Sequence, residues 1–227
     1  MSLKNLSIII PLGPHEDQVS MLLEDLALLE QGSEVDIILV SCGDHSLPPV
    51  CEGQLRWITS AQGRAIQQNA GAKVARHDML WFLHADSRVT QQGLDALEHS
   101  VKAAPDALHY FHLKFRQDGP WGMWLNEWGA RFRSQILKVP FGDQGFCLSK
   151  KNFEQIGGFP EQVPYGEDHL LVWHARQAGI KLRCVGTALL TSARKYRQQG
   201  WGLLTLKYQV LWLKQALPEV CKLIRGK

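Results

Sequence analysis

The first 90 residues alternate short apolar runs with segments of helical periodicity, and this alternation restricts the fold more than any other feature. The apolar runs are residues 6–11, 35–40, 56–59 and 79–83. Such short runs of aliphatic and β-branched residues are typical of parallel strands covered on both faces. Helical spacing marks residues 16–31 and 63–76. The order β-α-β-β-α-β predicts a doubly wound, mainly parallel α/β sheet flanked by helices.

The second half of the chain has a more mixed pattern. We expect helices near residues 90–104, 121–138 and 167–177, strands near 107–115 and 181–185, and a glycine-punctuated stretch at 142–158. No internal repeat or low-complexity linker interrupts the chain. We therefore expect a single domain over residues 1–227 that ends in a C-terminal helix.

Composition excludes several classes of protein. No run of 18 apolar residues occurs, residues 1–10 lack the pattern of a signal peptide, and the five cysteines include no Cys-x-x-Cys pair. We expect a cytoplasmic protein without a disulfide framework or zinc site. Net charge is +3, but residues 193–227 hold eight Lys or Arg against Glu219 alone, which gives +7. No reading motif accompanies these charges, so nucleic acid is not an expected partner.

Ligands of a doubly wound sheet bind beyond the carboxyl ends of its strands. His84 and Asp86 follow the last strand of the first half, and in an extended conformation both would point to the same side. An imidazole and a carboxylate suit a divalent metal such as Mn²⁺ or Mg²⁺. The alternative is that Asp86 caps the following turn while His84 packs beside the sheet.

Three further segments carry polar groups beside glycines or at helix starts. Gly63 and Arg64 open a predicted helix and could face a phosphate, or form an ordinary helix start. Asp143 lies between two glycines, where the backbone can approach a ligand, or in a simple polar turn. Glu167 and Asp168 begin a helix, where they either complement its dipole or accept a proton from a hydroxyl.

These segments, in this order, resemble the motif series of glycosyltransferase family two. The matching segments are Ser7-Ile-Ile-Ile-Pro11, Gly63-Arg-Ala-Ile-Gln-Gln-Asn-Ala-Gly-Ala72, Leu83-His-Ala-Asp86, Gly142-Asp-Gln-Gly145, Gly157-Gly-Phe-Pro160 and Glu167-Asp168. Within the family, the chain is most similar to a small bacterial subgroup with the Leu-His-Ala-Asp and Gly-Asp-Gln-Gly segments.

The resemblance implies a GT-A fold, which is Rossmann-like, with a nucleoside-diphosphate sugar as donor and usually an inverting displacement. It assigns Asp86 to the metal and diphosphate, with His84 as a second metal ligand, and Asp168 to the general base. Glu167 and Asp143 are further catalytic candidates. The expected donor-binding residues are Pro11, Ser41, Asp44, Gly63, Arg64, Asn69, Ala85, Asp86 and Arg194. Residues 1–90 then form the nucleotide-binding half, 91–195 the acceptor and catalytic half, and 196–227 a basic amphipathic tail.

Two positions depart from the family pattern. One is His84, which stands in place of the first Asp of the more usual Asp-x-Asp motif, although the subgroup shares it. The other follows the second strand. In the family the second strand usually runs into an Asp that contacts the nucleoside, whereas here Ser41 occupies that place and Asp44 follows three residues later. The donor base therefore stays open. Two rival interpretations are a nucleotidyltransferase, which lacks a lysine-containing phosphate loop here, and a nucleotide-binding module with a degenerate site.

Aromatic and aliphatic residues recur at helical spacing in two segments. Trp121, Trp124 and Trp128 form one stripe, which we expect to pack in the core; the alternative is an apolar or sugar-stacking wall for the acceptor. Residues 201–217 would present two apolar faces. Together with the basic charge, they predict contact through residues 201–227 with an anionic membrane surface, at its inner face, or with a second copy in a homodimer. The acceptor, lipid-linked or small and polar, is left open.

Overall fold

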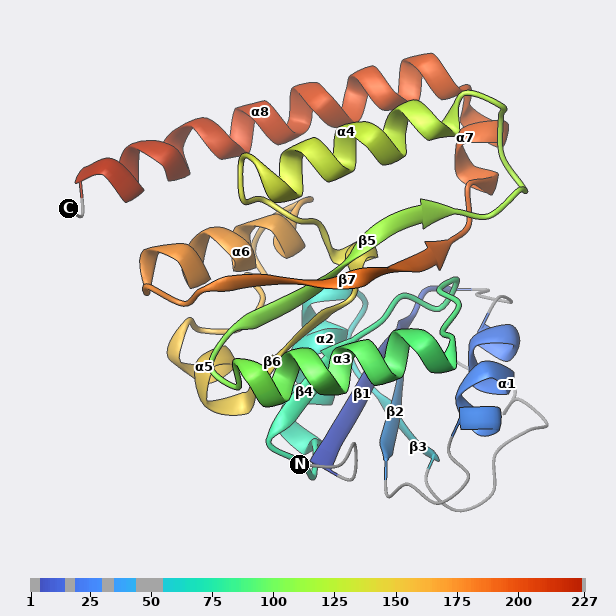
Figure 1. The fold of residues 1–227 in the computed structure, drawn as a ribbon, viewed down its shortest axis with the longest axis vertical. Helices are drawn as coiled ribbons and strands as arrows, with labels where there is room; N and C mark the ends of the chain where they lie inside the picture. The colour runs from blue at the N-terminus through green and yellow to red at the C-terminus, as the bar shows by residue number, and fades with distance from the viewer. Residues whose placement is uncertain (1–4, 15–18, 30–34, 44–54, 226–227) are drawn as a thin grey trace.

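The structure, a computed structural model, describes residues 5–14, 19–29, 35–43 and 55–225 (Figure 1). In chain order its strands and α-helices are β1 (Leu6–Leu12), α1 (Val19–Leu29), β2 (Asp36–Ser41), β3 (Leu55–Thr59), α2 (Arg64–Val74), β4 (Met79–Phe82), α3 (Gln91–Ala103), β5 (Leu108–Phe115), α4 (Met123–Gln135), β6 (Phe146–Ser149), α5 (Lys150–Gln155), α6 (Glu167–Gln177), β7 (Leu182–Thr191), α7 (Arg194–Gln199) and α8 (Trp201–Arg225). A short 3₁₀ turn, η2 (Gly142–Gln144), precedes β6.

One seven-stranded sheet runs through both halves of the chain, in the order β3-β2-β1-β4-β6-β5-β7. The pairs β1–β2, β2–β3, β1–β4 and β5–β7 are parallel, whereas β6 is antiparallel to both of its neighbours. The strand order reverses between β1 and β4, which makes their carboxyl ends the switch point where such sheets bind ligands. The predicted β-α-β-β-α-β order and the mainly parallel α/β sheet are confirmed.

Two elements of the second half were not predicted, and one is longer than expected. The glycine-punctuated stretch contains β6 and α5, which have only four and six residues and so show little periodicity. The last strand extends to Thr191 rather than 185, because it pairs with β5 along most of its length, with an irregularity between Tyr110 and His112.

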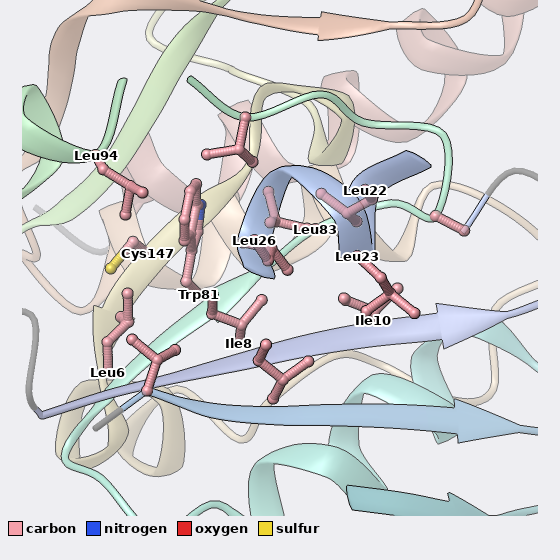
Figure 2. Packing of buried hydrophobic residues seen from close by; sticks show 14 of the residues in the cluster. Leu6, Ile8, Ile10, Leu22, Leu23, Leu26, Trp81, Leu83, Leu94 and Cys147 are labelled. Carbon is pink, nitrogen blue, oxygen red and sulfur yellow. The ribbon is translucent and has the colours of Figure 1, made fainter. Parts of the chain in front are cut away.

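The apolar strands are buried on both sides, as their composition predicts. Ile8 and Ile10 point to the face covered by α1 and α3, and Ile9 points to the opposite face, covered by α2, α5 and α6. Figure 2 shows the first of these clusters, where leucines of α1 lie over the isoleucines of β1. Burial of both faces stabilises the centre of the sheet and leaves its edges for polar groups.

Helix α2 packs very close to β1 and so determines where its first residues lie. A Cβ added at Gly71 would approach Cγ2 of Ile9 to 2.5 Å, so only glycine permits this distance. One turn earlier, the side-chain Nε2 of Gln67 donates to the backbone carbonyls of Leu12 at 2.7 Å and Val40 at 2.6 Å. These contacts place the start of α2, including Arg64, beside the carboxyl ends of β1 and β2.

We call the amino-terminal ends of the parallel strands the amino edge of the sheet. There the carboxylate of Asp36 links three segments of the chain. It accepts hydrogen bonds from Nε and Nη2 of Arg56, both at 2.7 Å, from the Ser7 hydroxyl at 2.8 Å and from the backbone N–H of Arg76 at 3.0 Å. Because burial opposes the charge but these donors outweigh it, the pKa of Asp36 lies below its ordinary value. Both carboxylate oxygens are therefore paired.

Helices α4 and α8 lie side by side in a layer above β5 and β7 (Figure 1). The expectation that Trp121, Trp124 and Trp128 pack in the core is wrong, because 86%, 56% and 65% of their surfaces are exposed. The side of α4 that packs on β5 instead presents Met123, Ala130 and smaller polar groups. In the part of the chain that the structure describes, no helix is both long and apolar enough to span a membrane.

Candidate active site

A cleft of about 1140 Å³ opens at the carboxyl ends of β1 and β4 and continues between α4 and α8. The lower wall comes from the ends of these strands and from the start of α2. Helices α4, α6, α7 and α8 supply the opposite wall. The cleft thus lies where the strand order reverses, at the position expected from the sheet topology.

The structure brings most of the candidate residues to this cleft. Those that line it are Pro11, Gly63, Arg64, His84, Ala85, Asp86, Asp143, Asp168 and Arg194. Glu167 lies directly behind this lining, where it pairs with Arg64. Ser41 and Asn69 are held elsewhere, and Asp44 lies outside the described residues.

His84 and Asp86 do not continue strand β4 in an extended conformation. The strand ends at Phe82, and the backbone N–H of Ser87 donates to the carbonyl of His84 at 3.1 Å, which closes a turn. The premise that two-residue spacing aligns these side chains is therefore wrong. Both nevertheless line the cleft, because the turn itself faces the switch point.

The imidazole of His84 has an unusual environment. Its Nε2 atom is buried and finds no hydrogen-bond partner among the described residues. Burial, and then the positive charge of Arg64, lower the pKa of His84 below its ordinary value. The ring is therefore neutral near pH 7, the form in which an imidazole nitrogen binds a metal.

Asp168, in the first turn of α6, has both carboxylate oxygens oriented by backbone groups. Oδ2 accepts from the N–H of Gly142 at 2.7 Å, and Oδ1 accepts from the N–H of His169 at 2.8 Å. Burial disfavours the charged form, but the Arg64 and His169 charges and the Gly142 hydrogen bond outweigh it, so the pKa of Asp168 falls to about 2. This carboxylate is ionised near neutral pH.

Gly142 separates Asp168 from His84. A Cβ at this position would lie 2.9 Å from Oδ2 of Asp168 and 3.2 Å from Nε2 of His84, so a side chain would push one of them out of place. The absence of a side chain thus allows η2 to approach both groups. This explains in physical terms why the turn at residues 142–145 begins with glycine.

Arg64 is held by carboxylates at the opposite wall. Its Nε donates to Glu167, whose side chain is buried, and Asp168 lies near enough to act on it. Desolvation in the cleft lowers the pKa of Arg64, but the charges of Asp168 and Glu167 more than compensate and raise it. The interaction joins α2 to α6 and holds the guanidinium group in the lining of the cleft, where it is suited to bind an anion.

Asp143 differs from Asp168 in having few hydrogen bonds. Its Oδ1 atom is buried without a partner among the described residues. Burial raises the pKa of Asp143 to about 6, a change that the nearby charge of Arg133 opposes and that of Asp168 reinforces. A carboxylate that titrates close to neutral pH is suited to proton transfer.

Sequence reasoning missed Arg133, which is buried in α4 and lines the cleft. Its guanidinium carbon lies 3.5 Å from the centroid of the Phe141 ring, and its Nε donates to the carbonyl of Val139 at 3.2 Å. The available signal was the four-residue spacing of Leu125, Gly129 and Arg133, which places one cation in a row beside the tryptophan stripe and outside it.

Two predicted donor-binding residues have structural partners instead. Ser41 is fully buried and its hydroxyl accepts from Nε1 of Trp57 at 2.9 Å. The amide of Asn69 binds the backbone of Phe159 in both directions, at 2.8 and 2.9 Å, and so holds the loop that follows Gly158. Neither side chain lines the cleft.

The site suits a divalent metal only if a ligand completes its coordination. No group of three or more His, Cys, Asp or Glu side chains within the described residues is arranged to hold a metal ion. The unpaired Nε2 of His84 and the carboxylate of Asp86 supply one nitrogen and one oxygen donor at the same cleft. Two protein ligands leave most positions for the oxygens of a diphosphate and for water.

Comparison with known proteins identifies the fold. No protein-family model matches this sequence, and no curated protein matches it. Among solved structures, S. aureus TarS residues 1–349 superimposes with a TM-score of 0.64 and 14% identity, over 83% of this chain and 60% of TarS. The same fragment in complex with UDP-GlcNAc gives a TM-score of 0.64 and 13% identity, over 83% of this chain and 58% of the fragment.

A second glycosyltransferase structure has the same architecture. The mannosyltransferase PcManGT from Pyrobaculum calidifontis, in complex with GDP-Man and Mn²⁺, gives a TM-score of 0.58 and 16% identity, over 82% of this chain and 56% of PcManGT. This chain therefore spans 56–60% of these solved chains. At such low identity the likeness shows the fold, and the predicted GT-A fold is confirmed.

Proposed function

We propose that this protein is a glycosyltransferase that transfers a sugar from a nucleoside-diphosphate sugar to an acceptor hydroxyl. The observation that carries the proposal is the convergence of His84, Asp86, Asp143 and Asp168 on one cleft at the switch point of a GT-A sheet. The structural neighbours support the choice of donor, since one was solved with UDP-GlcNAc and another with GDP-Man. The motif series resembles family two, in which inverting displacement is usual.

The donor would lie across the carboxyl ends of β1 and β4. Pro11 and Gly63 line this part of the cleft, and the backbone amides at the start of α2 and the Arg64 guanidinium provide donors for phosphate oxygens. His84 and Asp86 are the residues that would hold Mn²⁺ or Mg²⁺. A bound divalent ion would neutralise the charge that develops on the departing diphosphate.

Asp168 is the proposed general base. An acceptor oxygen forms a bond to the anomeric carbon while the bond from that carbon to the diphosphate oxygen breaks, and its electron pair leaves with the diphosphate. Asp168 takes the hydroxyl proton. The hydrogen bonds from Gly142 and His169 fix the orientation of the carboxylate, and its low pKa keeps it in the ionised form that can receive a proton, although it makes the carboxylate a weak base. Transfer then depends on the hydroxyl becoming acidic as the new bond forms.

The test separates donor binding from transfer. Nucleoside diphosphates and their sugars should raise the melting temperature of the wild-type protein in the presence of Mn²⁺. A ligand at one hundred times its dissociation constant adds about 2.7 kcal/mol to the free energy of unfolding. The same donors should then be tested for release of nucleoside diphosphate, with water or added alcohols as acceptors.

Asp168→Asn should retain this donor-induced shift but lose transfer by roughly 100- to 10,000-fold, the usual contribution of a general base. Asp95→Asn, an exposed acid on α3, is the matched control. Undiminished turnover of Asp168→Asn would rule out its role as base. Donor binding without transfer by the wild type, across the panel, would indicate a nucleotide-binding module instead.

A further inference from the structure

Most of the exposed large apolar side chains lie on or next to helices α4 and α8. On α4 the exposed side chains are Trp121 just before the helix, Trp124, Trp128, Phe132 and Ile136; on α8 they are Leu203, Leu206, Val210, Leu213, Leu217 and Ile224. We call these eleven residues the α4–α8 apolar face. Contiguous exposed apolar surface on a folded protein marks an interaction site.

The spacing on α8 follows the helix, and the opposite side is already occupied. Leu203, Leu206, Val210, Leu213 and Leu217 recur every three or four residues on one side. The other side packs on the fold: Gln215 contacts His169 at 2.7 Å and donates to the carbonyl of Tyr165 at 2.6 Å. The exposed stripe is therefore not a core face that α8 could bury by rotating.

The two helices are held in register by polar contacts. The side chain of Asn126 on α4 donates to the Thr205 hydroxyl at 3.1 Å and accepts from Nε1 of Trp201 at 2.8 Å. The α4–α8 apolar face therefore has a defined geometry, with tryptophans along one helix and aliphatic side chains along the other. Figure 1 shows the two helices side by side. On α4, the rings of Trp128 and Phe132 stack at 6.0 Å.

The charged residues around this face favour an anionic binding partner. Apart from Arg133, which is buried at the cleft, residues 121–138 and 194–225 contain nine Lys or Arg but only Glu127 and Glu219 as acids. Both acids have internal partners: Glu127 accepts from the N–H of Phe115 at 2.7 Å, and Glu219 from Lys222. Two copies of the protein meeting through this face would bring like charges together, whereas anionic lipid headgroups would complement them.

We infer that the α4–α8 apolar face docks on an anionic lipid bilayer, with α8 lying in the interface plane. Lys207 and Lys214 are exposed seven residues apart, beside the aliphatic stripe, where their ammonium groups reach the headgroups while their stems remain against apolar surface. Tryptophan is the side chain most suited to the boundary between headgroups and acyl chains.

The docked orientation has a consequence for the cleft, which continues between these same two helices. Leu125 and Asn126 of α4 and Tyr208 and Trp212 of α8 line it. The acceptor would then be a hydroxyl carried by a membrane lipid, a consequence that rests on the proposed function. Docking itself does not, and it can be measured without donor, metal or turnover.

The experiment is co-sedimentation of the whole protein with vesicles of phosphatidylglycerol mixed with phosphatidylcholine, or of phosphatidylcholine alone, at low and high ionic strength. We expect binding to the anionic vesicles that weakens with salt. The variant Leu206→Gln with Leu213→Gln should reduce partitioning roughly tenfold or more. Leu28→Gln, which alters an equally exposed leucine on α1, should bind like the wild type.

Lysine variants test the charge term separately. Lys207→Gln with Lys214→Gln should lower partitioning about fivefold for each lysine removed. Lys73→Gln with Lys151→Gln makes the same change in net charge on exposed positions of α2 and α5 and should leave binding unchanged. All variants alter exposed side chains, and circular dichroism checks that they fold.

Three results would overturn the inference. Wild-type protein that stays in the supernatant with anionic vesicles at low salt has no such surface. A loss in Lys73→Gln with Lys151→Gln equal to that in Lys207→Gln with Lys214→Gln would mean that binding depends only on total charge. A dimer by light scattering that the two leucine substitutions dissociate, without any vesicle binding, would assign the α4–α8 apolar face to a second copy.

Discussion

Buried polar side chains lie at both ends of the parallel strands, which we call the amino edge and the carboxyl edge of the sheet. They are paired at the amino edge, and some are unpaired at the carboxyl edge. At the amino edge, Asp36 accepts from Arg56, Ser7 and the backbone of Arg76, and both of its oxygens are paired. At the carboxyl edge, Asp143 Oδ1 and His84 Nε2 are buried without partners among the described residues. The first arrangement lowers the pKa of its carboxylate, and the second raises that of Asp143 to about 6.

This difference separates a carboxylate that stabilises the fold from one that we propose acts on a ligand. A buried carboxylate with a full set of donors strengthens the native state relative to one that has lost its partner. A buried polar atom without a partner costs free energy of folding, so its retention beside a cleft indicates a role toward a ligand. Substitutions at the amino edge should therefore change mainly the free energy of unfolding, and substitutions at the carboxyl edge mainly the rate of transfer.

The largest effect is expected from Asp86→Asn at the carboxyl edge. Loss of the carboxylate that we propose binds the metal should lower kcat/KM for transfer by about 10,000-fold, or on the order of 5 kcal/mol, because a divalent ion supplies several kcal/mol of charge stabilisation. The melting temperature without ligand should hardly change. Steady-state kinetics with Mn²⁺ measures the first quantity and a thermal scan the second. If the variant responds to Mn²⁺ as the wild type does, the metal lies elsewhere.

Asp36→Ala should show the reverse pattern at the amino edge. Removing the carboxylate leaves Arg56 without its buried partner, and we expect a loss of about 3–5 kcal/mol in the free energy of unfolding. The kcat per folded molecule should stay unchanged. Denaturant unfolding followed by fluorescence measures the loss, and a fall in kcat at a temperature where the variant is fully folded would contradict the separation.

The pH dependence of this effect has a defined sign. Because the pKa of Asp36 is lowered in the folded state, its stabilisation is present above the unfolded value, about 3.9, and is lost as the pH falls through the folded value. The stability difference between wild type and Asp36→Ala should therefore be constant near neutral pH and shrink below about pH 4. A difference that grows on acidification would be inconsistent with a depressed pKa.

The smallest effect, with the opposite sign, is expected for Asp143→Asn. A raised pKa means that ionised Asp143 opposes folding above about pH 6, and that this penalty disappears below the unfolded value. The variant should be more stable than the wild type at pH 8, by on the order of 1 kcal/mol, and no more stable at pH 4. Unfolding in a chelating buffer measures this. Destabilisation at pH 8 would show that Asp143 contributes to folding.

The sequence was sufficient to predict strands and helices whose pattern of apolar residues lies within one short segment. The apolar runs predicted β1, β2, β3 and β4, and α6 begins at Glu167 and ends at Gln177, as its pattern indicated. The strand-end rule also located the cleft, which is why His84 and Asp86 line it although the geometry expected between them was wrong. The rule concerns topology and does not depend on whether the residues after the strand are extended.

The partners of single side chains and the orientation of α4 depend on contacts between segments that are distant in the sequence. Nothing local marks Ser41 as the partner of Trp57, or Asn69 as the support of the Phe159 loop, because those partners lie 16 and 90 residues away. Arg133 faces the cleft only because α4 packs on β5 with its small residues inward. The same packing leaves the tryptophans of α4 exposed, which periodicity alone could not decide, since a stripe has the same spacing whether it is buried or not.

The sequence by itself determined the mainly parallel sheet, the strand ends that ligands should approach and the polar residue types that follow them, because strand burial and strand-end polarity depend on short stretches of chain. The strand order, and with it the switch point, came from the tertiary structure. The tertiary structure decided protonation and exposure. Whether a carboxylate is paired, as Asp36 is, or partly unpaired, as Asp143 is, depends on desolvation and on charges brought from distant segments. The exposure of the α4–α8 apolar face likewise depends on which side of each helix the sheet covers.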